Sequence, residues 1–169
     1  MRLLINRAEI AKYRNIAKSV LDNVLNMHIL DAQVHDLQKL LGANFFNDLV
    51  ENYSTADYKT LLNGGTYTYN SVVYTNYGLR VVLVHYAYAR YVRFGQNIDT
   101  PFGLVVKQGE NSAQSSSSDK KAIYADNQTL AFNYWENVKQ FLDRNTTTYT
   151  KYRDNCVVDY RILKIRTIS

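Results

Sequence analysis

The segment from Leu79 to Phe94 constrains the fold more than any other part of the chain. It has the length and composition of a helix, and Gly95 follows where a helix is expected to end. Its apolar side chains fall on nearly every helical face, at Leu79, Val81, Val82, Leu83, Val84, Tyr86, Tyr88, Tyr91 and Val92. A helix that is apolar all round must be covered by other elements. We therefore predict a central helix surrounded by helical neighbours.

Two further segments are expected to cover this central helix. In residues 23–41 the apolar positions step by three or four and predict one buried stripe, at Met27, Leu30, Val34, Leu37 and Leu41. Residues 119–143 predict a long helix capped by Asp119. Its wide apolar face carries Ile123, Tyr124, Leu130, Ala131, Trp135, Val138, Phe141 and Leu142.

Shorter helices are predicted from their end signals. Asn6 and Glu9 have the spacing of a capping box, which places a helix over residues 7–15. Gly42 stands where a C-terminal cap is expected, and a short helix over residues 44–51 follows it. Another begins at a cap supplied by Ser54 or Thr55 and ends at the glycines after Leu62.

Between these helices the sequence changes to the pattern of a β-hairpin. Residues 66–69 and 72–75 are β-branched and aromatic, and Asn70 and Ser71 lie between them. Because an isolated two-stranded hairpin is only marginally stable in water, this one should pack on the domain or project as an arm.

Three stretches lack a helical period. Residues 99–103 predict a turn that leads into an extended run over 104–106, and a mobile, serine-rich loop is expected over 108–118. From residue 146 the chain is expected to leave the domain as an extended arm. Within it, residues 157–166 mostly alternate apolar with charged side chains, which favours docking on another subunit, with β-augmentation as one mode.

The chain length of 169 residues fits one domain. We predict a mainly α fold, a helical bundle around the central helix with a small hairpin over 66–75. The helical domain is expected to span 1–145, and the extended C-terminal arm 146–169. Deleting residues 150–169 should then leave the domain folded and impair assembly.

The composition points to contacts formed on assembly. The chain holds 15 Tyr, whose large apolar area and polar tip suit surfaces that are buried partly or only in a complex. Interface residues are therefore expected in the hairpin, the loop and the arm. They are Tyr67, Tyr69, Tyr74, Ser115, Ser116, Ser117, Tyr160, Arg161, Ile162, Lys164 and Arg166.

The formal net charge of +5 leaves two interpretations open. One is a mildly basic surface, which the absence of any block of five basic residues favours. The other is a small basic nucleic-acid-binding protein, in which Arg80, Arg90 and Arg93 on the central helix and the basic residues of the arm meet phosphate. The single Cys156 excludes an internal disulfide and fits a reducing cytoplasm.

The residues do not predict an enzyme, a metal site or a cofactor. His28 and His35 are two helical turns apart, about 10 Å, which is too far for one metal ion. His85 lies in the apolar central helix and is expected to be a core residue. Cys156 has no histidine near it in sequence, and the carboxylates make no recognisable pair. The sequence also lacks an apolar stretch long enough to span a membrane.

The order of these features resembles the head–tail adaptor, or neck-ring, proteins of tailed bacteriophages, of the type found in crAss-like phages. The resemblance covers about residues 10–142. Its most specific pieces are Tyr88-Ala89-Arg90-Tyr91-Val92 and Thr100-Pro101-Phe102-Gly103, and the tail beyond Tyr149 departs from it.

This resemblance implies a non-enzymatic structural subunit of the virion, assembled in the host cytoplasm. Such a subunit forms a homo-oligomeric ring, twelve-fold to match the portal protein, beneath which it docks. The ring extends the channel through which genomic DNA passes without sequence-specific binding, and other neck or tail proteins bind below it. Contacts in a ring are head-to-tail, so each copy must carry two different complementary surfaces.

Overall fold

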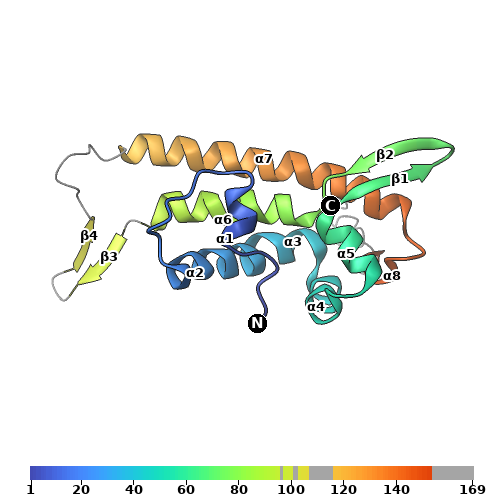
Figure 1. The fold of residues 1–169 in the computed structure, drawn as a ribbon, viewed down its shortest axis with the longest axis horizontal. Coiled ribbons are helices and arrows are strands. Elements are labelled where there is room, and N and C mark those ends of the chain that lie inside the picture. The colour runs from blue at the N-terminus through green and yellow to red at the C-terminus, as the bar shows by residue number, and fades with distance from the viewer. Residues whose placement is uncertain (96, 101–102, 107–115, 154–169) are drawn as a thin grey trace, which may run out of the picture.

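The computed structural model describes residues 1–95, 97–100, 103–106 and 116–153 and has the predicted mainly helical fold (Figure 1). The helices are α1 (Arg7–Ala11), α2 (Asp22–Ala32), the π-helix η1 (Gln33–Leu37), α3 (Gln38–Leu41), α4 (Ala43–Asn52), α5 (Ala56–Asn63), α6 (Leu79–Phe94), α7 (Ser117–Arg144) and α8 (Thr150–Arg153). The strands are β1 (Gly65–Tyr69), β2 (Val72–Asn76), β3 (Asn97–Thr100) and β4 (Gly103–Val106), paired as two antiparallel hairpins.

Helix α6 is the centre of the bundle and has the predicted bounds. It lies between α7 on one side and the continuous run α2–η1–α3 on the other, and α1 packs across it (Figure 1). Both flanking helices run antiparallel to α6. Its side chains from Leu79 through Ala87 are buried except for that of Arg80. The burial of an all-apolar helix by two long neighbours therefore accounts for most of the core.

The buried stripe of α2 differs from the predicted one. Met27 and Leu30 are 64% and 37% exposed, and the buried positions are instead Leu25, His28, Ile29, Ala32 and Gln33. The reason is the π-turn η1, which fits an extra residue into one turn and shifts the phase of the helix before it. Leu37 and Leu41, which follow the turn, are buried as predicted.

Gln33 in the π-turn holds the N-terminal segment on the core. Its Oε1 accepts from the Leu4 backbone N–H at 2.7 Å, and its Nε2 donates to the Arg2 carbonyl at 3.0 Å. The amide side chain thus satisfies two backbone groups beside the buried Leu4 and Ile5.

Helix α1 is shorter than predicted and ends at Ala11. Asn6 caps it by accepting from the Glu9 backbone N–H, but the Glu9 carboxylate accepts from Lys12 instead of completing a capping box. The later helices begin and end close to the predicted residues. Gly42, at φ +77°, separates α3 from α4, where Phe45, Phe46 and Leu49 are buried.

Helix α7 begins earlier than predicted. Ser116, not Asp119, is the N-cap, and Asp119 completes a capping box with it. Ser117 is therefore the first residue of α7 rather than part of a loop, and residues 107–115 lie outside the described part. The predicted extended run 104–106 is in β4, and its partner β3 is not predicted by the sequence. Leu130, assigned to the buried face, is 37% exposed.

The chain after α7 folds back onto the domain, so the predicted arm does not begin at residue 146. Tyr149 and Tyr152 are buried, and both rings contact Phe45 of α4 edge-on, at 6.2 and 5.5 Å between centroids. Residues 150–153 form α8. The remainder of the predicted arm, residues 154–169, lies outside the described part of the structure.

Candidate interaction surface

The hairpin β1–β2 stands at one end of the bundle and projects beyond it (Figure 1). Its strands pair in the register Tyr69↔Val72 and Tyr67↔Tyr74, as the predicted two-residue turn requires. Asn70 and Ser71 both have positive φ, 49° and 63°. Positive φ at both central residues defines the type I′ turn, whose twist matches that of the strands.

Two glycines bring the ends of the hairpin together. Gly64 before β1 and Gly78 after β2 both have positive φ, and each lies against backbone of the other side. A Cβ on Gly64 would lie 2.4 Å from the Asn76 carbonyl oxygen, and one on Gly78 would lie 2.5 Å from the Leu62 carbonyl oxygen. No other residue type fits this approach without a shift of the backbone.

Helix α7 fixes the outer edge of β2. Asn137 accepts from the Tyr77 backbone N–H at 3.0 Å, and its Nδ2 donates to the Thr75 carbonyl at 2.9 Å. One amide side chain therefore bonds the end of this strand on its free side. The hairpin is attached to the bundle by directed bonds as well as by its connections to α5 and α6.

Arg144, the last residue of α7, lies against the tyrosine face of the hairpin. Its guanidinium is 3.9 Å from the ring centroid of Tyr74 and 5.1 Å from that of Tyr69, and Nη1 donates to the Tyr67 hydroxyl at 2.9 Å. Tyr67 in turn stacks on Tyr74 and meets Phe141 edge-on at 4.9 Å. The hydrogen bond that Arg144 donates to the Tyr67 hydroxyl raises the pKa of Arg144. We call these residues the tyrosine clamp: Tyr67, Tyr69, Tyr74, Phe141 and Arg144.

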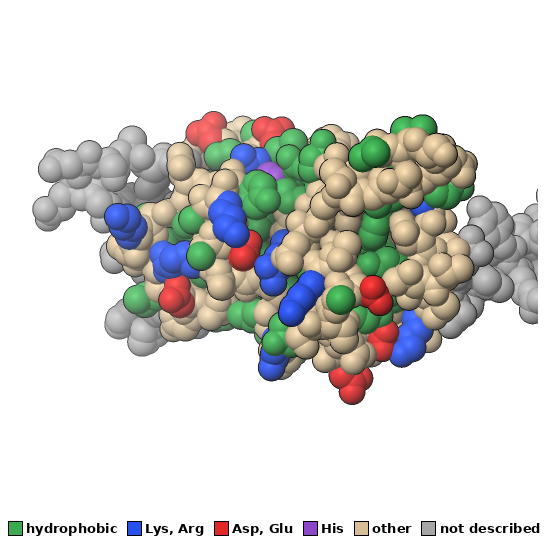
Figure 2. Space-filling view, turned by 45° about the vertical axis from the view of Figure 1, so that its right-hand side comes forward, with side chains coloured by type: hydrophobic (Ala, Val, Ile, Leu, Met, Phe, Trp, Pro, Cys, Tyr) green, Lys and Arg blue, Asp and Glu red, His purple; other side chains and the backbone are tan. Residues whose placement is uncertain are grey.

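The outer end of the hairpin exposes apolar side chains. Val73 is 68% exposed, Val72 is 51% exposed and Tyr69 is 39% exposed. Figure 2 shows hydrophobic side chains at this end of the molecule, at upper right. Since the clamp holds the hairpin in place, the surface is presented in one orientation. We call these three residues the hairpin tip.

The structure brings together the three tyrosines predicted to form an interface, but it divides their roles. Tyr67 and Tyr74 are half-buried in the clamp, and only Tyr69 among them reaches the tip. Ser116 and Ser117 form the start of α7, at the opposite end of the bundle from the hairpin (Figure 1). The other predicted interface residues lie outside the described part: Ser115, Tyr160, Arg161, Ile162, Lys164 and Arg166.

Sequence reasoning missed the residues that position the hairpin. Arg144 and Asn137 carry no motif, because their partners are 60 or more positions away in the chain. The adjacent Val72 and Val73 next to a tight turn are the one signal that could have located the tip, since one of two consecutive strand residues must face away from the bundle.

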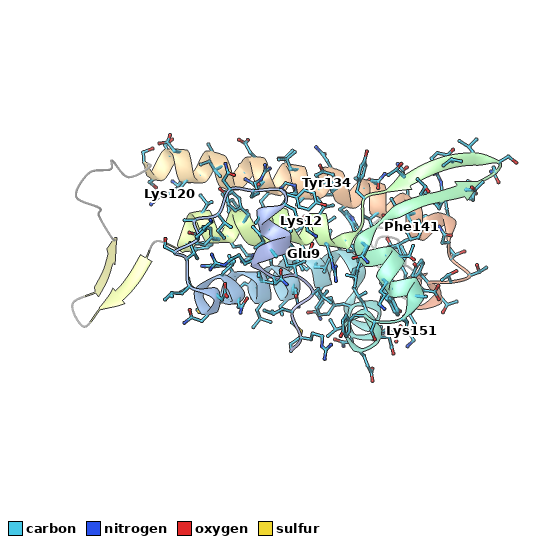
Figure 3. All side chains as sticks on the ribbon, viewed as in Figure 1. Glu9, Lys12, Lys120, Tyr134, Phe141 and Lys151 are labelled. Atoms are coloured by element: carbon cyan, nitrogen blue, oxygen red, sulfur yellow. The ribbon has the colours of Figure 1, made fainter. Side chains whose placement is uncertain are left out.

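A second aromatic cluster attaches α8 below the hairpin. The Tyr149 hydroxyl donates to the Asp57 carbonyl at 2.8 Å, and Lys151 pairs with Asp48 at 2.6 Å. Figure 3 shows Lys151 and Phe141 at this end of the bundle. Burial raises the pKa of Tyr149 to about 12. Bonds from Lys151 and then Tyr58 hold the pKa of Asp48 below its ordinary value.

The arginines considered for nucleic-acid binding are largely engaged within the protein. Arg90 makes a bidentate pair with Asp36, at 2.7 and 3.0 Å, and Arg80 donates to Asn63 at 2.8 Å. Arg93 lies over the ring of Tyr124 at 4.9 Å. On the face shown in Figure 2, Lys and Arg side chains are dispersed and interspersed with Asp and Glu.

His85 lies in a polar cluster within the core. Arg14 donates from Nη2 to His85 Nδ1 at 3.2 Å and from Nε to Asn127 at 2.9 Å, while the ring of Tyr134 stacks on the imidazole at 5.3 Å. Burial lowers the pKa of His85. In the described part of the chain, no three His, Cys, Asp or Glu side chains are grouped so as to hold a metal ion. No described helix is long and apolar enough to cross a membrane.

These features define a small, mainly helical protein that presents a fixed β-hairpin with an exposed apolar tip. The chain belongs to the family DUF6712, described as a family of unknown function, which matches residues 37–162. The match covers the hairpin, the central helix and α7. No curated protein and no solved structure matches the chain.

Proposed function

We propose that this protein is a non-enzymatic structural subunit of the head–tail adaptor ring of a tailed phage. In this proposal copies form a ring beneath the portal protein, extend the DNA channel and bind further neck or tail proteins. The proposal rests on the resemblance of residues 10–142 to such adaptors and on the hairpin tip.

The hairpin tip is the observation that carries the proposal. Solvent-exposed Val and Tyr at the end of a projecting hairpin are unfavourable in water unless a partner covers them. The tyrosine clamp and Asn137 hold this surface in a fixed orientation, which lowers the entropy lost when a partner binds. A rigid apolar projection suits a permanent contact between proteins.

The test compares the mass of the protein in solution with and without the portal protein. We expect the wild-type chain to bind the portal and to form an oligomer of defined mass, which electron microscopy shows as a ring. Val73→Asp places a charge on the tip and should weaken this assembly at least tenfold. Because Val73 is exposed, the variant should fold normally.

Asn133→Asp is the matched control. Asn133 is exposed on α7, one helical turn before Asn137, and is not part of the hairpin tip, so this substitution adds the same charge outside the tip. It should assemble like the wild type. A wild-type chain that stays monomeric at every concentration and ignores the portal would refute the proposal.

A small basic nucleic-acid-binding protein is the second candidate, favoured by the net charge of +5. The two candidates differ in what the isolated monomer does. Tight DNA binding by a monomer, falling steeply with salt, would favour the second candidate. The internal pairing of Arg90 with Asp36 weighs against it.

A further inference from the structure

The outer edge of strand β1 is open. In an antiparallel pair with a two-residue turn, residues of the first strand alternate between facing the partner and facing away from it. The register Tyr69↔Val72 makes Thr66 and Thr68 the outward-facing residues of β1. Both are exposed, and no described residue bonds to their outward backbone groups. This edge can therefore accept another strand.

The two edges of the hairpin differ in this respect. On β2 the outward-facing Thr75 carbonyl accepts from Asn137 of α7. The side chain of α7 thus occupies the position that an added strand would need. On this hairpin, the described edge that leaves room for an additional strand is therefore that of β1.

The chain itself contains a segment suited to that place. Residues 157–166 follow α8 and alternate apolar with charged side chains in two short runs, 158–162 and 163–166, a pattern that favours an extended strand. The segment contains no proline, so every residue can donate a backbone hydrogen bond. The hairpin residues from Gly65 to Asn76 include no charged side chain of their own, and the guanidinium of Arg144 lies against the face that carries Tyr67, Tyr69 and Tyr74.

We propose that residues 157–166 of one copy pair as a third strand with the outer edge of β1 in a second copy. This inference rests on the proposed function, because it requires that copies of the chain assemble with one another. It identifies the contact between neighbouring copies. Each copy then carries a donor segment and an acceptor edge, which are different surfaces. A contact of this kind is head-to-tail and closes into a ring when the last copy joins the first.

The length of the segment permits exchange between copies. The chain continues from Arg153 to Ser169, and 16 extended residues reach about 50 Å. Helix α7, the longest element, has 28 residues and a length of about 42 Å. Residue 157 lies four residues beyond Arg153, within about 14 Å of it, so the acceptor edge of the second copy must lie near the end of α8.

Disulfide trapping between two different variants tests the proposal. Both carry Cys156→Ser. The acceptor has Thr68→Cys, and each donor has one cysteine placed in turn at positions 158 to 164. The two are mixed under assembly conditions, oxidised mildly and separated without reductant. We expect a linked dimer of donor and acceptor, strong at every second donor position and weak between, since side chains of a strand alternate in direction.

An acceptor with Asn133→Cys in place of Thr68→Cys is the matched control and should give no such pattern. Hydrogen exchange gives an independent measurement on the unmodified protein. The amides of Thr66 and Thr68 should exchange at least tenfold more slowly in the assembly than in the monomer.

Two results would overturn the proposal: linkage no stronger than in the control at every donor position, or amides of Thr66 and Thr68 that exchange equally fast in the assembly and in the monomer. Its failure is distinguishable from failure of the proposed function. If the wild type forms rings and binds the portal but gives no alternating linkage, the strand exchange is wrong and the adaptor function stands. A wild type that neither assembles nor binds the portal refutes the function itself.

Discussion

At the scale of single residues, Arg144 shows how one side chain can fix the orientation of an element. Its planar guanidinium lies over Tyr74 and Tyr69 and donates to the Tyr67 hydroxyl at the same time. Lysine could keep the charge, but its ammonium has neither the plane nor the fork of donors. The position of the hairpin relative to α7 therefore depends on this particular residue type.

We expect Arg144→Lys and Arg144→Ala to loosen the hairpin without unfolding the bundle. Hydrogen exchange of the β1 and β2 amides should accelerate severalfold, while the midpoint of chemical unfolding should change little. Lys139→Ala, an exposed residue of the same helix, is the control and should change neither quantity. Unaltered exchange in both Arg144 variants would show that the clamp does not hold the hairpin.

His85 is a buried base kept neutral by its surroundings. Burial lowers its pKa, the Asn127 bond opposes this effect, and the charge of Arg14 adds to it. Arg14 donates toward Nδ1, so a proton on that atom would face another donor. Burial likewise lowers the pKa of His28, opposed by Asp31, with Arg90 adding a smaller effect in the same direction as burial.

These pKa shifts predict that the protein loses stability in mild acid. With pKa values depressed in the folded state, the unfolded chain binds more protons, and stability rises with pH. The free energy of unfolding should thus be at its full value above pH 6.5, the ordinary pKa, and fall as the pH drops below it. Chemical unfolding at a series of pH values measures this slope.

His85→Gln should make that slope shallower, and His35→Gln, at an exposed position, should leave it as in the wild type. A slope that is identical in the wild type and in His85→Gln would contradict the assignment of His85 as a source of the acid sensitivity.

At the scale of elements, the π-turn η1 decides which face of the first long helix is buried. Without it, the regular α-helical period places Met27 and Leu30 inward with Leu37 and Leu41. With it, Leu25 and Ile29 are buried and Gln33 reaches the N-terminal segment. The amide of Gln33 has two backbone partners in the core, which helps to compensate for the weaker geometry of the π-turn.

The second feature at this scale is that the chain after α7 folds back onto the bundle. Tyr149 and Tyr152 lie among Phe45, Phe141 and Trp135, so α8 completes the core at the hairpin end. Deletion of residues 150–169 removes α8 and the buried Tyr152. We therefore expect this deletion to destabilise the domain, not to spare it. The described fold thus extends to Arg153, eight residues beyond the predicted end of the domain.

A chain that ends at Arg153 keeps α8 and the buried Tyr149 and Tyr152. A chain that ends at Asn145 loses both tyrosines and uncovers Phe45, which should lower the free energy of unfolding by about 3 kcal/mol or more. Chemical denaturation of the two truncations measures the difference. Equal stability would mean that α8 contributes nothing to the core.

At the scale of the whole molecule, the basic side chains behind the net charge of +5 are dispersed and form no single patch on the face shown in Figure 2. Arg7 pairs with Asp22, Arg90 with Asp36 and Lys151 with Asp48, so several of the basic side chains already have acidic partners. A surface of this kind attracts phosphate without binding it tightly. That property is consistent with the DNA channel of the proposed adaptor ring.

We therefore predict weak DNA binding by the isolated protein. The dissociation constant for duplex DNA at physiological salt should lie in or above the non-specific range of roughly 10⁻⁴ to 10⁻⁶ M. Fluorescence anisotropy over a series of salt concentrations measures both the affinity and its salt slope. Nanomolar binding with a steep slope would indicate a nucleic-acid-binding protein instead.

Much of the architecture could be predicted because it follows from local patterns. The bounds of α6, the turn at Asn70 and Ser71, and the glycines that end α3 and α5 all depend on residues adjacent in the chain. The tyrosine clamp could not be predicted in the same way. Its contacts join residues about 70 positions apart, and nothing in either sequence segment specifies the other.

The sequence by itself determined that this chain forms a helical bundle around an apolar helix, with a tight hairpin beside it. Hydrophobic period and turn chemistry act over a few residues, so they can be seen in the sequence. The tertiary structure alone decided which face of α2 is buried, that Tyr149 and Tyr152 join the core and which edge of the hairpin stays open. Those features depend on packing between distant segments, where one added residue in a turn or one arginine over a ring changes what is exposed.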